Sequence, residues 1–134
     1  MSRVFVVRHA LGPKVSGSAL AAADGFSARY DLDRQAGVFS RPNHKLAGQS
    51  YVGRILILTT AKGGVASAWM LREMCQSGKA PLALVFNTVN PILAQGAAFA
   101  GLTLLAGFDV DITAHIASGA QVTLDPSSRT LMLD

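Results

Sequence analysis

The residues best placed to do chemistry follow an apolar run in the middle of the chain. Residues 54–59 read Arg-Ile-Leu-Ile-Leu-Thr, and a short loop then leads into the helical pattern of residues 65–77. A strand that ends at glycines and opens into a helix leaves free backbone N–H groups at the helix start, and such an end attracts carboxylate or phosphate groups. The loop at Lys62, Gly63 and Gly64 is therefore predicted to bind an anion.

The residues around this loop each have a functional and a structural interpretation. Lys62 could pair with a substrate carboxylate or phosphate, or it could be an exposed loop lysine. Gly63 and Gly64 could let a ligand approach the backbone, or could serve turn geometry alone. Thr59 and Thr60 end the apolar run, where they could reach a ligand or cap the turn. All five are kept as candidate substrate-binding residues.

Other polar residues near the predicted site also have two interpretations. Ser67 lies one helical turn beyond the glycines, where a serine commonly hydrogen-bonds its own backbone. Asn90 follows the apolar run 82–87, which places it either beside the site in a parallel sheet or at the N-cap of the next helix. Asp109 and Asp111 alternate on one extended segment, which we interpret as a solvated loop rather than a carboxylate pair.

The residue types that bind metals are sparse and dispersed. His9, His44 and His115 have no neighbours at ligand spacing, and Cys75 is the only cysteine. A single cysteine rules out an intrachain disulfide and a site built from cysteines alone. We therefore expect no metal site in this chain.

The elements that must position the loop can be traced by hydrophobic pattern. Residues 54–59, 82–87 and 102–105 are continuously apolar, as in strands covered on both faces. Helices are predicted at 65–77, before a C-terminal Gly78, and at 92–100. The alternation of strand and helix predicts parallel central strands, because a crossover helix joins each pair.

The two ends of the chain are richer in extended structure. Short strands are predicted at 4–7, 15–23 and 38–39, and a hairpin at 121–124 and 129–133. The expected fold class is thus α/β, with parallel central strands and two helices flanked by antiparallel β structure. We expect one domain over residues 1–134, because this length suits a single core.

Composition limits the classes of partner. The chain has 134 residues, is 50% hydrophobic and 15% charged, and carries a net charge of +4. Its basic residues are scattered, so we expect no nucleic acid partner. The N-terminal apolar run is too short for a signal peptide and no stretch is long enough to span a membrane, which predicts a cytoplasmic protein. The high apolar content suggests a surface buried against a partner, and Trp69 is a candidate for the core or for that interface.

Several segments, taken in order, resemble the swivel domain, or small subunit, of the aconitase X family of dehydratases. The segments are 15–20, 33–37, 44–50, 53–58, 78–81 and 90–97. The resemblance implies a β/β/α swivelling domain and a large partner subunit that carries an iron–sulfur cluster. It also implies dehydration of a small hydroxy acid, with cis-3-hydroxy-L-proline preferred over phosphomevalonate.

One departure from the family concerns the base. The resemblance implies a loop of glycine, basic residue, glycine and serine, in which the serine accepts the proton. Alignment on Lys62 puts Gly64 at the serine position, so Ser67, Thr59 or Thr60 acts instead, or the chemistry differs. The alternatives are a non-catalytic anion-binding or regulatory module and an interaction scaffold.

Overall fold

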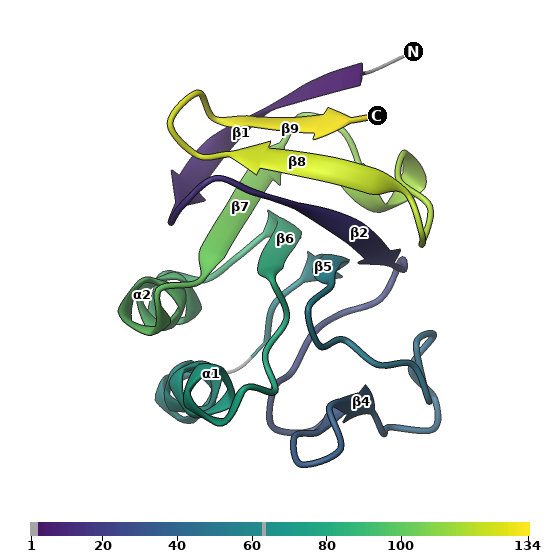
Figure 1. The fold of residues 1–134 in the computed structure, drawn as a ribbon, viewed down its shortest axis with the longest axis vertical. Coiled ribbons are helices and arrows are strands. Elements are labelled where there is room, and N and C mark those ends of the chain that lie inside the picture. Colours follow the sequence, from purple (N-terminus) through teal and green to yellow (C-terminus); the bar gives the residue numbers. More distant parts are fainter. Residues whose placement is uncertain (1–2, 63) are drawn as a thin grey trace.

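A computed structural model describes residues 3–62 and 64–134 (Figure 1). Strands predominate over these residues. In chain order the elements are β1 (Arg3–Leu11), β2 (Val15–Ala21), β3 (Leu32–Asp33), β4 (Val38–Phe39), β5 (Ile55–Thr60), α1 (Val65–Ser77), β6 (Ala83–Thr88), α2 (Pro91–Ala100), β7 (Thr103–Phe108), the 3₁₀ helix η1 (Ile112–Ala114), β8 (Gln121–Asp125) and β9 (Thr130–Leu133). The predicted mixture of parallel strands, two helices and antiparallel strands is confirmed.

Seven of the strands close into a barrel. Their order around it is β1-β7-β6-β5-β2-β8-β9, in which β2, β5, β6 and β7 run parallel and the remaining pairs are antiparallel. The barrel closes because β1 is longer than predicted. Its first half pairs with β9 and its second half with β7. The sequence pattern did not predict this closure.

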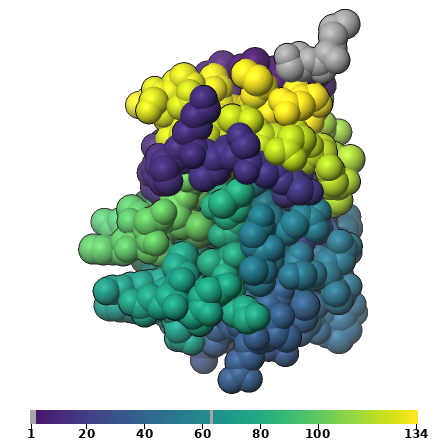
Figure 2. Space-filling view, in the orientation of Figure 1, coloured from purple at the N-terminus to yellow at the C-terminus, as the bar shows by residue number. Residues whose placement is uncertain are grey.

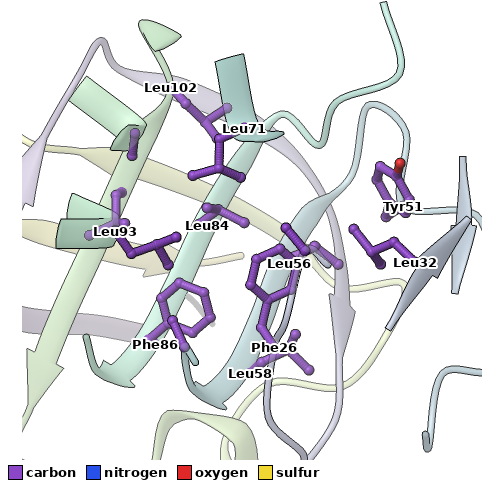
Figure 3. Packing of buried hydrophobic residues seen from close by; sticks show 14 of the residues in the cluster. Phe26, Leu32, Tyr51, Leu56, Leu58, Leu71, Leu84, Phe86, Leu93 and Leu102 are labelled. Carbon is purple, nitrogen blue, oxygen red and sulfur yellow. The ribbon is translucent and has the colours of Figure 1, made fainter. Parts of the chain in front are cut away.

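The parallel strands are buried on both faces, as their apolar runs predicted. Ile57 and Val85 point into the barrel interior, while Leu58 and Phe86 pack beneath the helices and the long loop that follows β2 (Figure 3). Successive side chains of a strand point to opposite faces, so each run supplies both clusters.

The helices α1 and α2 lie side by side on the same side of the parallel strands (Figure 1). Helix α1 has the predicted bounds and ends at Gly78, whose φ of 75° is left-handed. The Asn90 side chain accepts a hydrogen bond from the Leu93 N–H at 2.9 Å, which confirms the N-cap interpretation. Gly96 faces Ala68 so closely that an added Cβ would lie 2.5 Å from the Ala68 Cβ. The helices therefore touch at this point.

The segment between β2 and β5 carries polar side chains to the end of β5. Phe26 is fully buried and donates its N–H to the Thr60 carbonyl at 2.9 Å, and Lys62 donates its N–H to the Phe26 carbonyl at 2.7 Å. Tyr51 anchors the return of the segment to the core. The residues around Phe26 are therefore held against the loop that precedes α1.

Candidate functional site

A pocket of about 380 Å³ lies where the start of α1 faces the segment after β2. Cationic side chains and backbone of both segments meet in it. Its lining residues are Gly25, Ser27, Arg29, Tyr30, Asp31, Arg41, Lys62, Gly64, Ala66 and Ser67. The site is thus made by two parts of the chain that are distant in sequence.

The start of α1 offers the pocket uncapped N–H groups. Gly64 is the N-cap residue and provides no side chain, and the first turn of the helix holds no acidic residue. Among the described residues, the first helical hydrogen bond of α1 runs from the Ala68 N–H to the Gly64 carbonyl at 3.1 Å. Within the described part of the chain, the N–H groups before Ala68 have no helical partner, so together with the helix dipole they favour an anion.

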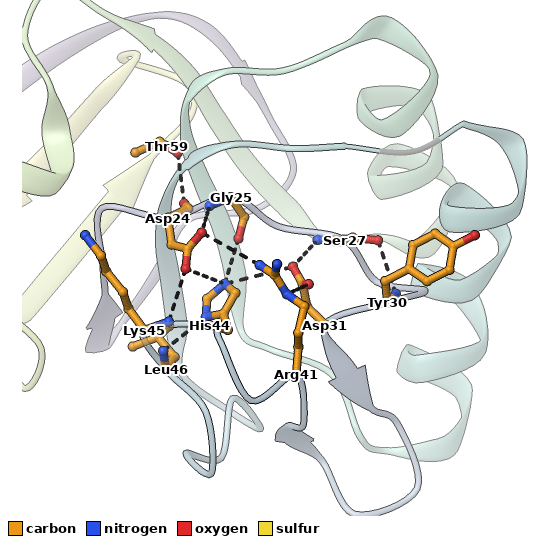
Figure 4. A network of polar contacts seen from close by, with 10 residues as sticks. All are labelled: Asp24, Gly25, Ser27, Tyr30, Asp31, Arg41, His44, Lys45, Leu46 and Thr59. Atoms are coloured by element: carbon orange, nitrogen blue, oxygen red, sulfur yellow. Dashed lines mark hydrogen bonds and ion pairs between the residues drawn. The ribbon is translucent and has the colours of Figure 1, made fainter.

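Arg41 is the best-oriented cation of the pocket (Figure 4). Its Nε lies 2.6 Å from Oδ1 of Asp31, whose side chain is only 5% exposed. The other oxygen of Asp31 accepts the Ser27 N–H at 2.9 Å. Asp24 lies 3.8 Å from the Arg41 terminal nitrogen. A guanidinium has five N–H donors, so this anchoring leaves several for a ligand.

His44 is a buried residue that contacts the same segment of the chain. Its side chain is fully buried and stacks on the Phe39 ring, with 4.6 Å between centroids. Its Nδ1 accepts the Leu46 N–H at 3.0 Å, and its Nε2 lies 2.8 Å from the Gly25 carbonyl oxygen. An accepting Nδ1 places the proton of the neutral ring on Nε2, which donates to Gly25. His44 therefore helps to fix the position of Gly25, which lines the pocket.

Asp24 is held in its charged form. Partial burial acts to raise the pKa of Asp24, but hydrogen bonds from the Lys45 and Gly25 N–H groups and the charge of the nearby Arg41 act against it, and the pKa falls below its ordinary value of 3.8. Its carboxylate accepts the Lys45 N–H at 3.1 Å and the Gly25 N–H at 2.8 Å. Asp24 thus ties two loops together near the pocket.

Three of the predicted site residues line this pocket. They are Lys62, Gly64 and Ser67. Ser67 is 3% exposed, and among the described residues its hydroxyl has no hydrogen-bond partner. Gly63 was also predicted and lies outside the described residues.

The other predicted residues have structural roles away from the pocket lining. The Thr59 hydroxyl donates to the Asp24 carbonyl at 2.9 Å, and the Thr60 hydroxyl accepts from Thr88 at 3.0 Å. Asn90 caps α2. The structure therefore gathers only part of the predicted set.

Sequence reasoning missed the residues that face α1 across the pocket. Arg29 and Arg41 were counted only among the scattered basic residues, and Asp31 was not singled out. Asp31 and Arg41 are ten residues apart and meet because the intervening β3–β4 hairpin folds back, with Leu32 opposite Phe39. The cation and its carboxylate partner carry no local pattern, so no signal in the sequence could have paired them.

The described residues include no group of three or more His, Cys, Asp or Glu placed to hold a metal ion. Cys75 is half-buried, and burial raises the pKa of its thiol, which opposes the thiolate form. An iron–sulfur cluster needs several thiolates, so the described part of this chain does not fit one. Within the same residues, every helix is too short or too polar to cross a bilayer.

The chain thus folds as a mixed α/β barrel with two helices and a cationic pocket at the start of α1. Residues 4–133 match the family described as the Aconitase X swivel domain, and the chain belongs to that family. The resemblance seen in the sequence is thereby confirmed. The structure is similar to the crystal structure of aconitase X from Thermococcus kodakaraensis in its holo-form, with a TM-score of 0.90, 23% identity and 98% of each chain covered.

Curated relatives carry a more specific description. The chain is 26% identical over 112 residues to the phosphomevalonate dehydratase small subunit of Pyrococcus abyssi, covering 84% of each protein. It is 26% identical over 122 residues to the protein of the same name from Methanocella arvoryzae, covering 91% of this chain and 92% of the relative. These relatives are dehydratase small subunits, a name that implies a large partner subunit.

Proposed function

We propose that this chain is the small subunit of an aconitase X-type hydro-lyase and that its pocket holds the anionic part of a small hydroxy acid. One observation carries the binding role. The uncapped start of α1 faces Arg41, which Asp31 orients. Helix N–H groups and a pre-oriented guanidinium together make a site for carboxylate or phosphate. Family membership supports the dehydratase role.

The charge of the pocket bears on the substrate. Arg29, Arg41 and Lys62 all line it. Asp31 also lines the pocket and balances one of these charges, and the remaining excess of positive charge favours a ligand with more than one negative charge, such as a phosphorylated hydroxy acid. The sequence alone led us to prefer cis-3-hydroxy-L-proline, in which one carboxylate is balanced by the ring amine. We now place phosphomevalonate first, also because the relatives bear that name, and keep the hydroxyproline as the comparison substrate.

The partner supplies what this chain lacks. We assign the iron–sulfur cluster to the large subunit, because the described residues here hold no cluster of thiolates. The small subunit closes over the partner's site and excludes water from the bound anion. Water exclusion strengthens the pairing of Arg41 and Lys62 with that anion.

Proton removal needs a base, and Ser67 is our candidate. Of the three hydroxyl residues considered, Ser67 alone lines the pocket, and its hydroxyl is not engaged by another described residue. Thr59 and Thr60 are hydrogen-bonded elsewhere. In a dehydration, a base takes the proton from one carbon while hydroxide leaves the next.

A second candidate is a non-catalytic anion-binding module. It is favoured by Gly64, which gives the pocket no hydroxyl at the position where the family resemblance implies the base. In that case the pocket binds an anion and no water is lost. Turnover separates the two candidates.

The test is co-expression of this chain with the large dehydratase subunit of the same genome. The complex is assayed for water loss from phosphomevalonate and from cis-3-hydroxy-L-proline. We expect turnover of the phosphorylated acid, and we expect Ser67→Ala to lower kcat by about 100-fold or more. Ser128→Ala, in the β8–β9 turn, is the matched control and leaves kcat unchanged. Phosphate binding without turnover of either acid would favour the module instead.

A further inference from the structure

An apolar groove of about 230 Å³ lies between α1 and α2, outside the anion pocket. Figure 2 shows it as a notch between the two helices, which project from the body of the molecule. Four large apolar side chains that line it are exposed to solvent: Val65, Trp69, Ile92 and Phe99. Trp69 is 63% exposed and Phe99 is 80% exposed. Side chains of this size seldom gather on a free surface.

The close contact of the helices explains why these side chains point outward. Gly96 and Ala68 touch where the helices meet, so there is no space between them for larger groups. Helix α1 faces the core with Ser67, Leu71 and Met74. Trp69 is on another face of the helix. It therefore does not belong to the core, and of the two roles predicted from the sequence the one at an interface remains.

We propose that the large partner subunit docks across this groove and places an apolar side chain between Trp69 and Phe99. The inference rests on the proposed function, because the large subunit is the partner proposed there. The observation that supports it is that the groove and the anion pocket adjoin each other on α1. Val65 lines the groove, while Gly64 and Ala66 line the anion pocket, so both sites share the first turn of α1. A partner that closes over the pocket therefore meets the open end of the groove.

Charge favours this partner over a second copy of the chain. Arg72 lines the groove, and no carboxylate does. In the adjoining pocket Arg29, Arg41 and Lys62 outnumber the one carboxylate, Asp31, so the excess of positive charge extends into it. In a two-fold dimer formed through this groove, the positively charged edge of one chain would face the same edge of the other, and the two edges would repel each other. The complementary surface is therefore apolar at its centre and acidic at its rim.

The experiment measures binding of the full chain to the purified large subunit by calorimetry. Trp69→Glu and Phe99→Glu each place a charge in the groove, and we expect the Kd to rise about tenfold or more. Val6→Glu is the matched control, because Val6 is 69% exposed on β1 and lies outside the groove. Its Kd should equal that of the wild type. Melting curves confirm that each variant is folded.

The outcomes separate this inference from the proposed function. Wild-type binding that both groove variants weaken supports docking, even if the complex has no dehydratase activity. Equal binding by wild type and both groove variants overturns docking, even if the complex turns over. Failure of the wild type to bind the large subunit also overturns it. So does a concentration-dependent dimer of this chain that the groove variants abolish, because the occupant is then a second copy.

Discussion

Arg41 shows how a single residue acquires a role through its neighbours. Its side chain is 42% exposed, yet its Nε lies 2.6 Å from the Asp31 carboxylate, which is itself fixed by the Ser27 N–H. A side chain that is already oriented loses less conformational freedom when it binds a ligand. The buried Asp31 carboxylate therefore orients Arg41 for the ligand that we propose.

Removal of this guanidinium should weaken anion binding. We expect Arg41→Ala to raise the Kd for inorganic phosphate about tenfold, and Arg41→Lys to restore only part of the loss because lysine lacks the planar fork. Calorimetry with the purified chain measures both. Lys14→Ala, in the turn between β1 and β2, keeps the wild-type Kd. Equal Kd values for Arg41→Ala and wild type would show that the anion lies elsewhere.

Asp24 should make stability depend on pH. Its pKa is lower in the folded protein, so its contribution is complete above the unfolded pKa of about 4 and is lost as pH falls through the folded value. We expect the wild type to be more stable than Asp24→Asn at pH 7. The difference in Tm should shrink as pH falls below about 4. A difference that stays constant from pH 7 to pH 2.5 would contradict the shifted pKa.

Gly64 can accept the side chain that it lacks. Its φ is −127°, and a Cβ built there meets nothing within 4 Å. Gly64→Ser should therefore fold with a free energy of unfolding within about 0.5 kcal/mol of wild type. In the complex, we expect Gly64→Ser to recover turnover that Ser67→Ala has lost, because the new hydroxyl enters the same pocket. No recovery in a folded double variant would show that position 64 does not reach the proton.

At the scale of elements, the contact between α1 and α2 depends on one glycine. An alanine normally stabilises a helix interior by about 1 kcal/mol relative to glycine. At position 96, however, its Cβ would lie 2.5 Å from the Ala68 Cβ and 2.6 Å from the Ala68 Cα. The helices would have to separate, and such overpacking costs about 1–3 kcal/mol.

Gly96→Ala should therefore destabilise the protein despite its better helix propensity. Denaturant unfolding of the isolated chain measures the sign directly. Gly64→Ala, at a glycine with open space around it, serves as the control and should be close to neutral. A stabilising Gly96→Ala would mean that the helices can move apart at little cost.

At the scale of the whole molecule, closure of the barrel depends on β9. This strand joins β8 to β1, and its Leu131 is fully buried opposite Phe5 and Leu124. Met132 is next to Leu131 on the same strand and is 40% exposed on the other face. Truncating each side chain in turn therefore separates the contribution of interior packing to stability from any general effect of a substitution in β9.

Leu131→Ala should cost about 2–5 kcal/mol, because it leaves a cavity in the barrel interior. Met132→Ala should change the free energy of unfolding by no more than about 0.5 kcal/mol. Urea denaturation of both variants tests the pair. If both variants lowered the free energy of unfolding by similarly small amounts, the barrel interior would tolerate a cavity at Leu131.

The local sequence was sufficient for the elements whose signals lie within a few residues of one another. Helix α1 was predicted with its observed bounds, because Gly64 precedes it and the left-handed Gly78 ends it. The continuous apolar runs of β5 and β6 predicted burial on both faces. By contrast, β7 extends to Phe108, beyond the predicted end, because Gly107 interrupts the apolar pattern while the strand continues.

Only the tertiary structure decided which distant segments meet. Barrel closure pairs Arg3 with Leu133, and the fold-back of the segment after β2 brings Asp31 and Arg41 to the start of α1. Hydrophobic periodicity reports which face of an element is buried, since burial repeats with the period of the helix or strand. It carries no information about which loop lies opposite another. The candidate anion-binding loop was therefore visible in the sequence, while Arg41, which lines the same pocket, was not.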